Sequence, residues 1–323
     1  MTARPGTPRA LAVVAGVLID KAGQLLIAQR AADANDGGLW EFPGGKIAVG
    51  ECATEALIRE LTEEIGVVVN HAELFAVVRW RGPPRSLDLH TFSCRNWTGQ
   101  PIAHEHQALR WLPPAQLRHY PMPAPDRPIR ARLALPREYL ITPEPDADAD
   151  AFLSRLARTL ENPRLGIVSL RAKACERARL AQLAESMLRQ VRRQRPDLTA
   201  LIHGEPELAM QLGFDGVHLS SRQLQAVSRR PVPESFWLFA SCHNRAELNA
   251  AERLGADAVS LSPVTPTVSH PLATTLGWSA FAAAARLTWL PCFALGGLGP
   301  ADLDRALASG AHGVAGIRAY WRS

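Results

Sequence analysis

The residues whose types and spacing could support chemistry lie mainly between Gly45 and Val67, in the stretch GKIAVGECATEALIRELTEEIGV. Glu60, Glu63 and Glu64 are spaced i, i+3 and i+4, so on a helix their carboxylates share one face. At ~5 Å and an effective dielectric constant of ~20, each pair of carboxylates repels by roughly 3 kcal/mol. A hard divalent cation would offset that repulsion, because oxygen-rich sites suit magnesium. The spacing therefore indicates a magnesium site, and the alternative is a solvated acidic helix face.

The pattern around these carboxylates predicts the helix that must hold them. Ile58, Leu61 and Ile65 fall on its opposite face and would anchor it to a core. Gly66 is a typical C-terminal stop for such a helix. We therefore expect one amphipathic helix that carries the acidic face and ends at Gly66.

Short β-strands surround the predicted helix. Residues 11–19 and 24–28 are apolar and flank Asp20-Lys21-Ala22-Gly23, a turn signal that predicts a hairpin. Further strands are predicted at residues 74–79, 87–94 and 109–112, and a closing helix at residues 129–135. The pattern changes at Pro136, so we expect one domain over residues 1–136 and a second over residues 137–323.

The second half alternates short apolar segments with helical patterns. Predicted helices cover residues 151–160, 176–193, 245–254 and 300–309. Predicted strands cover residues 139–142, 166–170, 200–203, 216–219, 237–240, 258–261, 292–295 and 314–317. Eight β units with intervening helices are the pattern of a (β/α)8 TIM barrel.

The composition limits the classes of protein to consider. Hydrophobic residues make up 47% and charged residues 21%, as in ordinary soluble globular proteins, and no long apolar run predicts a membrane span. The net charge of +5 is almost wholly arginine, because Lys21, Lys46 and Lys173 are the only lysines. That charge suits a small anionic substrate. The sequence has no basic run with interleaved aromatic residues, so direct nucleic-acid binding is not expected. The five cysteines lack CxxC spacing, so we expect a cytoplasmic protein that contacts neither nucleic acid nor membrane.

The whole Gly45–Val67 pattern, with Glu51 and Arg59 at fixed offsets, resembles the Nudix box, with every position of the family pattern filled. The adjoining stretch LLIAQRAADANDGGLWEFPGGKIAVGE resembles the MutT branch of that family, the 8-oxo-dGTP diphosphatases. The resemblance covers roughly residues 10–135. It implies an α/β fold, an α/β/α sandwich with a mixed sheet, for the N-terminal domain.

The resemblance also implies roles for individual residues. Arg59 would orient the carboxylates, with Glu51 as its partner, and either Glu60 or Glu105 would take a proton from the attacking water. The implied ligands of Mg²⁺, with Mn²⁺ as an alternative, are the carbonyl of Gly44 and the carboxylates of Glu60, Glu63, Glu64 and Glu105. For Glu105 the alternative is a solvated loop residue.

The base pocket implied by the resemblance consists of Arg30, Phe42 and a late asparagine, whose place is taken here by Asp126. A carboxylate cannot donate a hydrogen bond as an amide can, unless it is protonated. Lys46, next to the metal loop, would hold a phosphate as a point charge. The alternative interpretation is that Arg30 is a surface residue, Phe42 a core residue and Asp126 a turn-forming residue.

By this resemblance the chain would hydrolyse 8-oxo-dGTP to 8-oxo-dGMP and pyrophosphate, with attack on the β-phosphorus. Such an enzyme prevents mutations by removing an oxidised nucleotide, a role classed with DNA repair. The alternatives are hydrolysis of another nucleoside diphosphate derivative, or a sensor that binds a nucleotide or thiamine precursor without turnover.

The segment from Tyr139 onward resembles the thiamine-phosphate synthase and thiazole tautomerase family. The matching pieces are YLIT at 139, SLRAK at 169, GVHL at 216, SCHN at 241, SPVTPT at 262, ALGG at 294 and GVAGI at 313. By this resemblance Arg171 and Lys173 would face a pyrophosphate. Backbone N–H groups at Gly296, Gly297, Gly316 and Ile317 would face a phosphate.

Four positions depart from the synthase pattern. Gly204 and Gln223 replace the two aspartates that hold magnesium, His270 replaces a phosphate-binding lysine, and Ser169 replaces a glutamine. We therefore do not expect an active synthase. The second domain is interpreted as a degenerate barrel that binds a phosphorylated thiamine precursor or serves only as structure, with His243 as a candidate general base.

Overall fold

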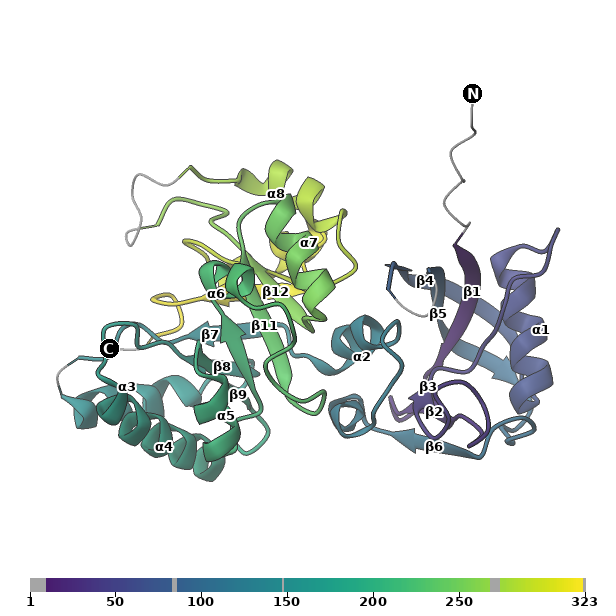
Figure 1. The fold of residues 1–323 in the computed structure, drawn as a ribbon, viewed down its shortest axis with the longest axis horizontal. Helices are drawn as coiled ribbons and strands as arrows, with labels where there is room; N and C mark the ends of the chain where they lie inside the picture. The colour runs from purple at the N-terminus through teal and green to yellow at the C-terminus, as the bar shows by residue number, and fades with distance from the viewer. Residues whose placement is uncertain (1–9, 83–85, 147, 268–273, 322–323) are drawn as a thin grey trace. The chain divides into compact units, whose positions relative to one another are not determined.

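The computed structural model describes residues 10–82, 86–146, 148–267 and 274–321. The chain divides into two compact units, Met1–Ala134 and Leu135–Ser323. Figure 1 shows both units as ribbons, with the first in purple and blue and the second from teal to yellow. Among the described residues, no helix has the length and apolar character that crossing a membrane would require.

The first unit contains two three-stranded sheets. In the first sheet, β5 (Leu87–Thr98) lies between β1 (Leu11–Leu18), with which it is parallel, and β4 (Val68–Trp80), with which it is antiparallel. The second sheet is antiparallel and has the order β3 (Trp40–Glu41), β2 (Leu25–Gln29), β6 (Ala108–Leu112). The mixed sheet expected from the sequence is thus confirmed.

The predicted hairpin of the first two strands is wrong, although its turn forms. The Asp20 carboxylate accepts hydrogen bonds from the N–H groups of Ala22 and Gln24, at 2.9 and 2.8 Å. Beyond one isolated bridge at Ile19 and Leu25, β1 and β2 separate into different sheets. Each strand pairs along its whole length with a partner distant in sequence, β1 with β5 and β2 with β6, and this pairing satisfies the backbone groups on that edge of the strand.

Helix α1 (Ala53–Ile65) lies beside the β1–β5–β4 sheet (Figure 1). Its first turn is capped by the Glu55 carboxylate, which accepts from the Cys52 N–H at 2.8 Å. Its buried side is formed by Ala56, Leu57, Leu61 and Ile65. Ile58 was expected to be an anchor but is only half-buried, because Leu57 takes the core-facing position.

Gly66 ends α1 as predicted, with a φ of 69° in the left-handed region. Its N–H donates to the carbonyl of Thr62, and the next N–H donates to the carbonyl of Leu61. The unit is completed by a short 3₁₀ helix, Pro114–His119, and by α2 (Arg127–Ala134). Helix α2 therefore begins two residues before its predicted start.

The second unit is a closed barrel of eight parallel strands, which confirms the predicted TIM barrel. The strands run in chain order around the barrel: β7 (Glu138–Ile141), β8 (Ile167–Leu170), β9 (Thr199–His203), β10 (Gly216–Leu219), β11 (Trp237–Cys242), β12 (Ala258–Leu261), β13 (Cys292–Ala294) and β14 (Gly313–Gly316). The surrounding helices are α3 (Ala149–Leu160), α4 (Arg177–Gln194), α5 (Pro206–Leu212), α6 (Ser221–Ala226), α7 (Arg245–Leu254), α8 (Gly277–Ala285) and α9 (Leu303–Ala308), with a 3₁₀ turn at Pro300–Asp302.

Aromatic side chains fill the interior of the barrel. The ring of Tyr139 packs edge-on against Phe239 and Phe293, with centroid distances of 5.7 and 5.6 Å. Its hydroxyl lies 2.7 Å from Nδ1 of His218, so this buried polar pair is satisfied. The barrel core is therefore packed, and its open end lies at the carboxyl ends of the strands.

Candidate functional site

Arg59 organises the acidic face of α1. Its guanidinium donates two hydrogen bonds to the Glu51 carboxylate, at 2.9 and 3.0 Å. It also donates to Glu60 at 2.8 Å, to Glu63 at 3.2 Å and to the carbonyl of Lys46 at 3.0 Å. The Arg59 hydrogen bonds lower the pKa of the Glu51 carboxyl. One side chain thus holds three carboxylates and the loop before the helix in a common geometry.

The glycine loop before α1 fits closely against two of these glutamates. A Cβ built on Gly45 would lie 2.3 Å from the carboxyl carbon of Glu60. The N–H of Gly44 donates to the Glu64 carboxylate at 2.9 Å. Gly44 has a φ of +149°, and a Cβ there would lie 2.3 Å from the carbonyl oxygen of Val14. Neither position leaves room for a side chain, so the glycines bring backbone and carboxylates together.

The carbonyl of Gly44 differs from the carbonyls on either side. The oxygens of Pro43 and Gly45 each accept a 2.8 Å hydrogen bond from the backbone of β1, from Gly16 and Val14 respectively. Within the described part of the chain, the Gly44 oxygen accepts none. The Gly44 oxygen is therefore free to accept a hydrogen bond or to ligate a cation next to Glu64.

Glu64, like Glu60, is less exposed than Glu63, with a side-chain exposure of 15% against 53%. Burial raises the pKa of this carboxyl to about 7, and the nearby His106 and the Gly44 N–H act in the opposite direction. A buried carboxylate without a full counter-charge is costly. A cation beside Glu64 would remove that cost.

Glu105 lies on a loop that is tied to both α1 and β2. The N–H of His104 donates to the carbonyl of Glu64 at 3.0 Å, and the N–H of Gln107 donates to the carbonyl of Gln29 at 2.9 Å. The Glu105 side chain itself is exposed. The loop therefore brings Glu105 to the end of the acidic helix, in a solvated position.

The oxygen ligands are of the type that a hard divalent cation prefers, but their side chains do not converge on one point. The oxygens of the three helix glutamates and the free Gly44 carbonyl are of the type that magnesium prefers. Among the described residues, no three His, Cys, Asp or Glu side chains converge closely enough to hold a metal as they stand. Arg59 holds Glu60 and Glu63 by hydrogen bonds, so these two carboxylates would turn toward an ion on binding.

The residues of the expected base pocket lie together at the other end of the glycine loop. Arg30 follows β2 directly and is paired with Glu41 on β3, while its Nε donates to the carbonyl of Asn35 at 2.7 Å. Phe42 is 2% exposed and belongs to the core. Asp126 precedes α2 and its pKa responds to the charges of both Glu41 and Arg30, so the four side chains share one environment.

Asp126 is buried, and that burial raises the pKa of its carboxyl to about 8. The charge of Glu41 acts in the same direction, whereas a backbone hydrogen bond from Phe42 lowers the pKa. At neutral pH the carboxyl is therefore largely protonated. In this form it carries an O–H donor, as the amide of an asparagine carries an N–H donor.

The sequence interpretation overlooked Glu41 and His106, although both lie in the motifs that it quoted. The side chain of His106 is 5% exposed, and its Nε2 lies 3.4 Å from Glu41 and 3.8 Å from Glu64. These carboxylates raise the pKa of His106, against the effect of burial. His106 thus lies between Glu64 on the acidic helix and Glu41, which neighbours the residues of the expected base pocket. The available sequence signal was the presence of these two titratable residues inside the quoted stretches WEF and AHEHQAL.

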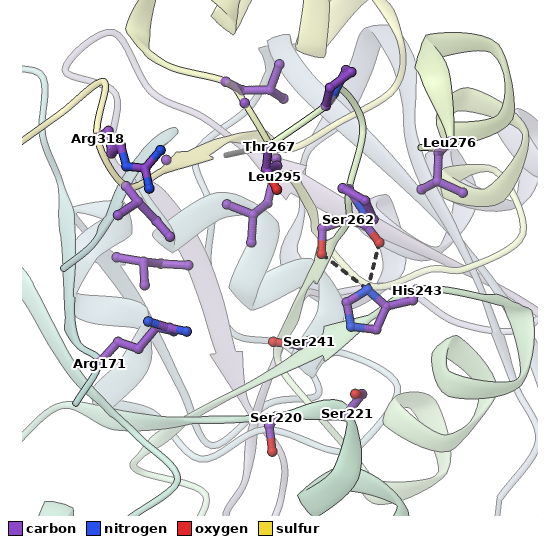
Figure 2. Close-up of a pocket in the computed structure, with 18 of the residues that line it drawn as sticks. Arg171, Ser220, Ser221, Ser241, His243, Ser262, Thr267, Leu276, Leu295 and Arg318 are labelled. Atoms are coloured by element: carbon purple, nitrogen blue, oxygen red, sulfur yellow. Dashed lines mark hydrogen bonds between the residues drawn. The ribbon is translucent and has the colours of Figure 1, made fainter. Parts of the chain in front are cut away.

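The barrel has a cavity of about 840 Å³ at the carboxyl ends of its strands. The sequence-predicted residues Arg171, Lys173, Gly296 and Gly297 all line it, as does His243. Figure 2 shows Arg171 and Arg318 on one side of the cavity and His243 with Ser262 on the other. Ser169 is buried in β8, and His270 lies outside the described residues.

The two positions where magnesium ligands were expected in the barrel are in contact with each other. The amide of Gln223 donates to the carbonyl of Gly204 at 2.9 Å, and its oxygen accepts from the hydroxyl of Ser220 at 2.9 Å. A Cβ at Gly204 would lie 2.7 Å from the Gln223 amide nitrogen. A neutral side chain fills this corner of the barrel.

Comparison with known proteins divides the chain in the same way. The model of the NUDIX domain matches residues 9–133, and that of thiamine monophosphate synthase matches residues 138–320. In the first half, a CTP pyrophosphohydrolase of Escherichia coli is 38% identical over 116 residues, covering 36% of this chain and 86% of the relative. An 8-oxo-dGTP diphosphatase of the same organism is 33% identical over 123 residues, covering 38% of this chain and 95% of the relative.

The second half is also similar to named proteins. A putative thiamine-phosphate synthase of Geobacter sulfurreducens is 35% identical over 183 residues, which covers 56% of this chain and 84% of the relative. Each half is thus similar to a separate protein over most of that protein's length.

Proposed function

Because the chain belongs to the NUDIX domain family over residues 9–133 and to the thiamine monophosphate synthase family over residues 138–320, we propose that its N-terminal unit hydrolyses 8-oxo-dGTP. The products are 8-oxo-dGMP and pyrophosphate, so the reaction removes an oxidised nucleotide before it can enter DNA. The unit is a Nudix hydrolase, and the similarity to two nucleotide hydrolases supports a nucleotide pyrophosphohydrolase activity.

The observation that carries the proposal is the contact of α1 with the glycine loop. The half-buried Glu64 carboxylate accepts from the Gly44 N–H at 2.9 Å, and the Gly44 carbonyl beside it is free. Glu60 lies against Gly45 and is held by Arg59. These contacts support the proposal that oxygen ligands and a proton acceptor share one surface.

Magnesium, or manganese in its place, would be held by Gly44, Glu60, Glu63, Glu64 and Glu105. When bound, such an ion neutralises phosphate charge and lowers the pKa of water. The residues of the chain do the rest. Arg59 orients the carboxylates, Glu60 or Glu105 accepts the proton of the attacking water, and Lys46 holds a phosphate by its charge.

The choice of base rests on Arg30, Glu41, Phe42 and Asp126. A neutral Asp126 carboxyl donates one hydrogen bond to a carbonyl oxygen of the base, as an amide would. The replacement of asparagine by aspartate therefore preserves a donor at this position. A site that hydrogen-bonds its substrate rejects analogues that leave its polar groups unpaired. The Asp126 donor therefore favours a base with a carbonyl oxygen facing Asp126.

CTP is the second candidate substrate. It is favoured by the 38% identity to a CTP pyrophosphohydrolase. Both candidates use the same acidic helix and differ only in the base pocket.

The direct test is release of pyrophosphate by the purified chain from a panel containing 8-oxo-dGTP, dGTP, CTP and nucleoside diphosphate derivatives, with MgCl₂ or MnCl₂. We expect the highest kcat/KM for 8-oxo-dGTP. A higher kcat/KM for CTP would move the function to the second candidate. Tight binding without turnover of any nucleotide would make the unit a sensor instead of an enzyme.

A further inference from the structure

His106 lies beside the residues of the expected base pocket, and no step of the proposed hydrolysis uses it. Its side chain is 5% exposed, and its Nε2 lies 3.4 Å from Oε1 of Glu41. We propose that His106 is a positioning residue for base recognition, which holds Glu41, and through Glu41 also Arg30, in the geometry that receives the base. The proposal rests on the nucleotide hydrolysis assigned to the N-terminal unit and adds a residue that does not touch the substrate.

The Glu41 carboxylate has a partner at each of its oxygens. Oε2 accepts from the guanidinium of Arg30, and Oε1 faces Nε2 of His106 at 3.4 Å. The Nε of Arg30 is used by the carbonyl of Asn35 at 2.7 Å. A carboxylate held at one oxygen can still turn about its side-chain bonds, whereas partners at both oxygens fix its orientation. Arg30 alone would therefore not fix the position of Glu41.

The β3–β2–β6 sheet brings these three side chains together from separate parts of the chain. Glu41 lies on β3, and Arg30 directly follows β2, the strand with which β3 pairs. His106 precedes β6 by two residues, and the N–H of the next residue, Gln107, donates to the carbonyl of Gln29 at 2.9 Å. Backbone pairing thus sets the place of the imidazole relative to Glu41 and Arg30.

The exposure of the three side chains places His106 behind the pocket. Arg30, Glu41 and His106 are 28%, 15% and 5% exposed, so a base that enters from solvent meets Arg30 first. Nδ1 of His106 is buried and has no hydrogen-bond partner in the described part of the chain. Because carboxylates only accept, the proton of the neutral ring is on Nε2. His106 therefore supports Glu41 by donating to it from the protein side.

Glu64 competes with Glu41 for the same nitrogen. Its Oε2 lies 3.8 Å from Nε2 of His106, beyond hydrogen-bonding distance, and already accepts from the Gly44 N–H at 2.9 Å. A single N–H serves one acceptor well, and Glu41 is the nearer one. His106 is thus assigned to the base pocket. Its loss should change the affinity for the nucleotide and leave the cation requirement of the acidic helix as it is.

The test measures binding of 8-oxo-dGMP to the full-length chain in EDTA by calorimetry, so the base pocket is probed without turnover and without a cation. His106→Leu removes the N–H donor, whereas His106→Gln keeps one. We expect His106→Leu to raise the dissociation constant about tenfold, through the loss of one hydrogen bond to a charged group. His106→Gln should restore most of the affinity, which a purely structural role of the imidazole ring would not predict.

Steady-state hydrolysis of 8-oxo-dGTP separates this role from a role in the chemical step. In His106→Leu the KM should rise about tenfold, while kcat and the half-saturating MgCl₂ concentration stay unchanged. His104→Leu is the control for disturbance of the loop, because His104 is exposed and its Nδ1 lies 3.1 Å from the backbone carbonyl of Glu63. This variant should keep the affinity for 8-oxo-dGMP.

A double-mutant cycle tests whether His106 acts through Glu41. In a Glu41→Gln background, His106→Leu should cause little further loss of affinity, because two residues that act through one contact are not additive. Full additivity would overturn the proposal, and so would a His106→Leu effect confined to the MgCl₂ requirement. Unchanged affinity in His106→Leu would overturn it and leave the proposed function in place. No hydrolysis of 8-oxo-dGTP by the unmodified chain would remove the proposed function and this role with it.

Discussion

At the scale of single residues, Arg59 decides how the acidic helix is arranged. It donates five hydrogen bonds, four of them to carboxylates of Glu51, Glu60 and Glu63. These bonds reduce the repulsion among neighbouring carboxylates in the absence of a cation. Because Glu51 holds the guanidinium on two sides, Arg59 remains in place when Glu60 and Glu63 turn toward a ligand.

Replacement of Glu63 by glutamine tests the proposed metal site. Glu63→Gln removes one charge from a side chain that is 53% exposed, so the fold should be retained. We expect kcat for 8-oxo-dGTP to fall about 100-fold or more, since the transition state loses preorganised electrostatic stabilisation. Steady-state kinetics of pyrophosphate release measure the effect, and circular dichroism checks the fold.

The matched control is Glu73→Gln on β4, a 76% exposed side chain that lies outside α1 and pairs with His71. This variant should keep the kcat of the unmodified chain. Equal rates for both variants and the unmodified chain would remove Glu63 from the metal site.

Asp126 shows how burial changes the chemistry of a residue type. Its pKa of about 8 lies well above the ordinary value of 3.8, mainly because burial disfavours the charged form. The folded state therefore binds a proton more tightly than the unfolded state. This residue contributes stability at low pH and loses that contribution as the pH rises from about 4 to about 8.

The pH dependence of Asp126→Asn tests this interpretation. Between pH 7 and 9, the KM of the unmodified chain for 8-oxo-dGTP should rise about tenfold, because the O–H donor is lost as Asp126 ionises. In Asp126→Asn the amide keeps its donor, so the KM of this variant should stay constant. The KM of the unmodified chain divided by that of the variant should therefore rise with pH. Thermal unfolding should show Asp126→Asn gaining stability relative to the unmodified chain over the same rise in pH. Parallel profiles in both measurements would show that Asp126 is already charged at pH 7.

At the scale of elements, the glycine loop and α1 work as a pair. The loop is fixed because the carbonyls of Pro43 and Gly45 accept hydrogen bonds from N–H groups of β1, and the helix packs on the same strand through Leu61. A Cβ on Gly16 of β1 would lie 2.7 Å from Leu61, which shows how closely the helix approaches the sheet. Sheet, loop and helix therefore set the distance between the Gly44 backbone and the Glu64 carboxylate.

Gly45→Ala tests whether this close approach matters for activity. The new Cβ would meet the Glu60 carboxyl at 2.3 Å, and the flexible side chain must move away. We expect kcat to fall by about tenfold or more with little change in the unfolding temperature, because a small misplacement of a catalytic group is costly. Gly50→Ala is the control, because its Cβ meets nothing within 4 Å although its φ of +88° adds strain. A larger loss of activity in Gly50→Ala would assign the effect to strain in the loop.

At the scale of the whole molecule, each unit has its own hydrophobic core and its own site. The core of the first unit is formed around α1 and β1, and that of the second around the barrel strands and their helices. The acidic helix belongs to the first unit and the barrel cavity to the second. The two sites can therefore be perturbed separately by substitution.

Magnesium should stabilise one unit selectively. An ion that binds only the folded state adds about 2.7 kcal/mol at a concentration 100 times its dissociation constant. We expect MgCl₂ to slow hydrogen exchange in α1 and the glycine loop, and EDTA to reverse this, while exchange in the barrel strands stays constant. In Glu64→Gln the protection of α1 should be lost. Slower exchange in the barrel on addition of MgCl₂ alone would contradict this selectivity.

Much of the fold could be predicted because its signals are local. The i, i+3, i+4 spacing placed the glutamates on α1, Gly66 ended the helix, and alternating apolar segments predicted the barrel strands. The functional roles of Glu60, Glu63, Glu64, Glu105 and the base-pocket residues stay predictions. These assignments rest on the resemblance to a family. The spacing of residues along the chain would not have identified Arg30 or Asp126.

By itself the sequence determined which residues share a helix face, where α1 ends, and which two families the halves resemble, since each depends on neighbours along the chain. Only the tertiary structure decided that β1 pairs with β5 and that His106 lies between Glu41 and Glu64. It also decided that Asp126 is buried and that Gln223 fills the space at Gly204. Strand partners, burial and pKa depend on groups distant in sequence, and these meet only when the chain folds.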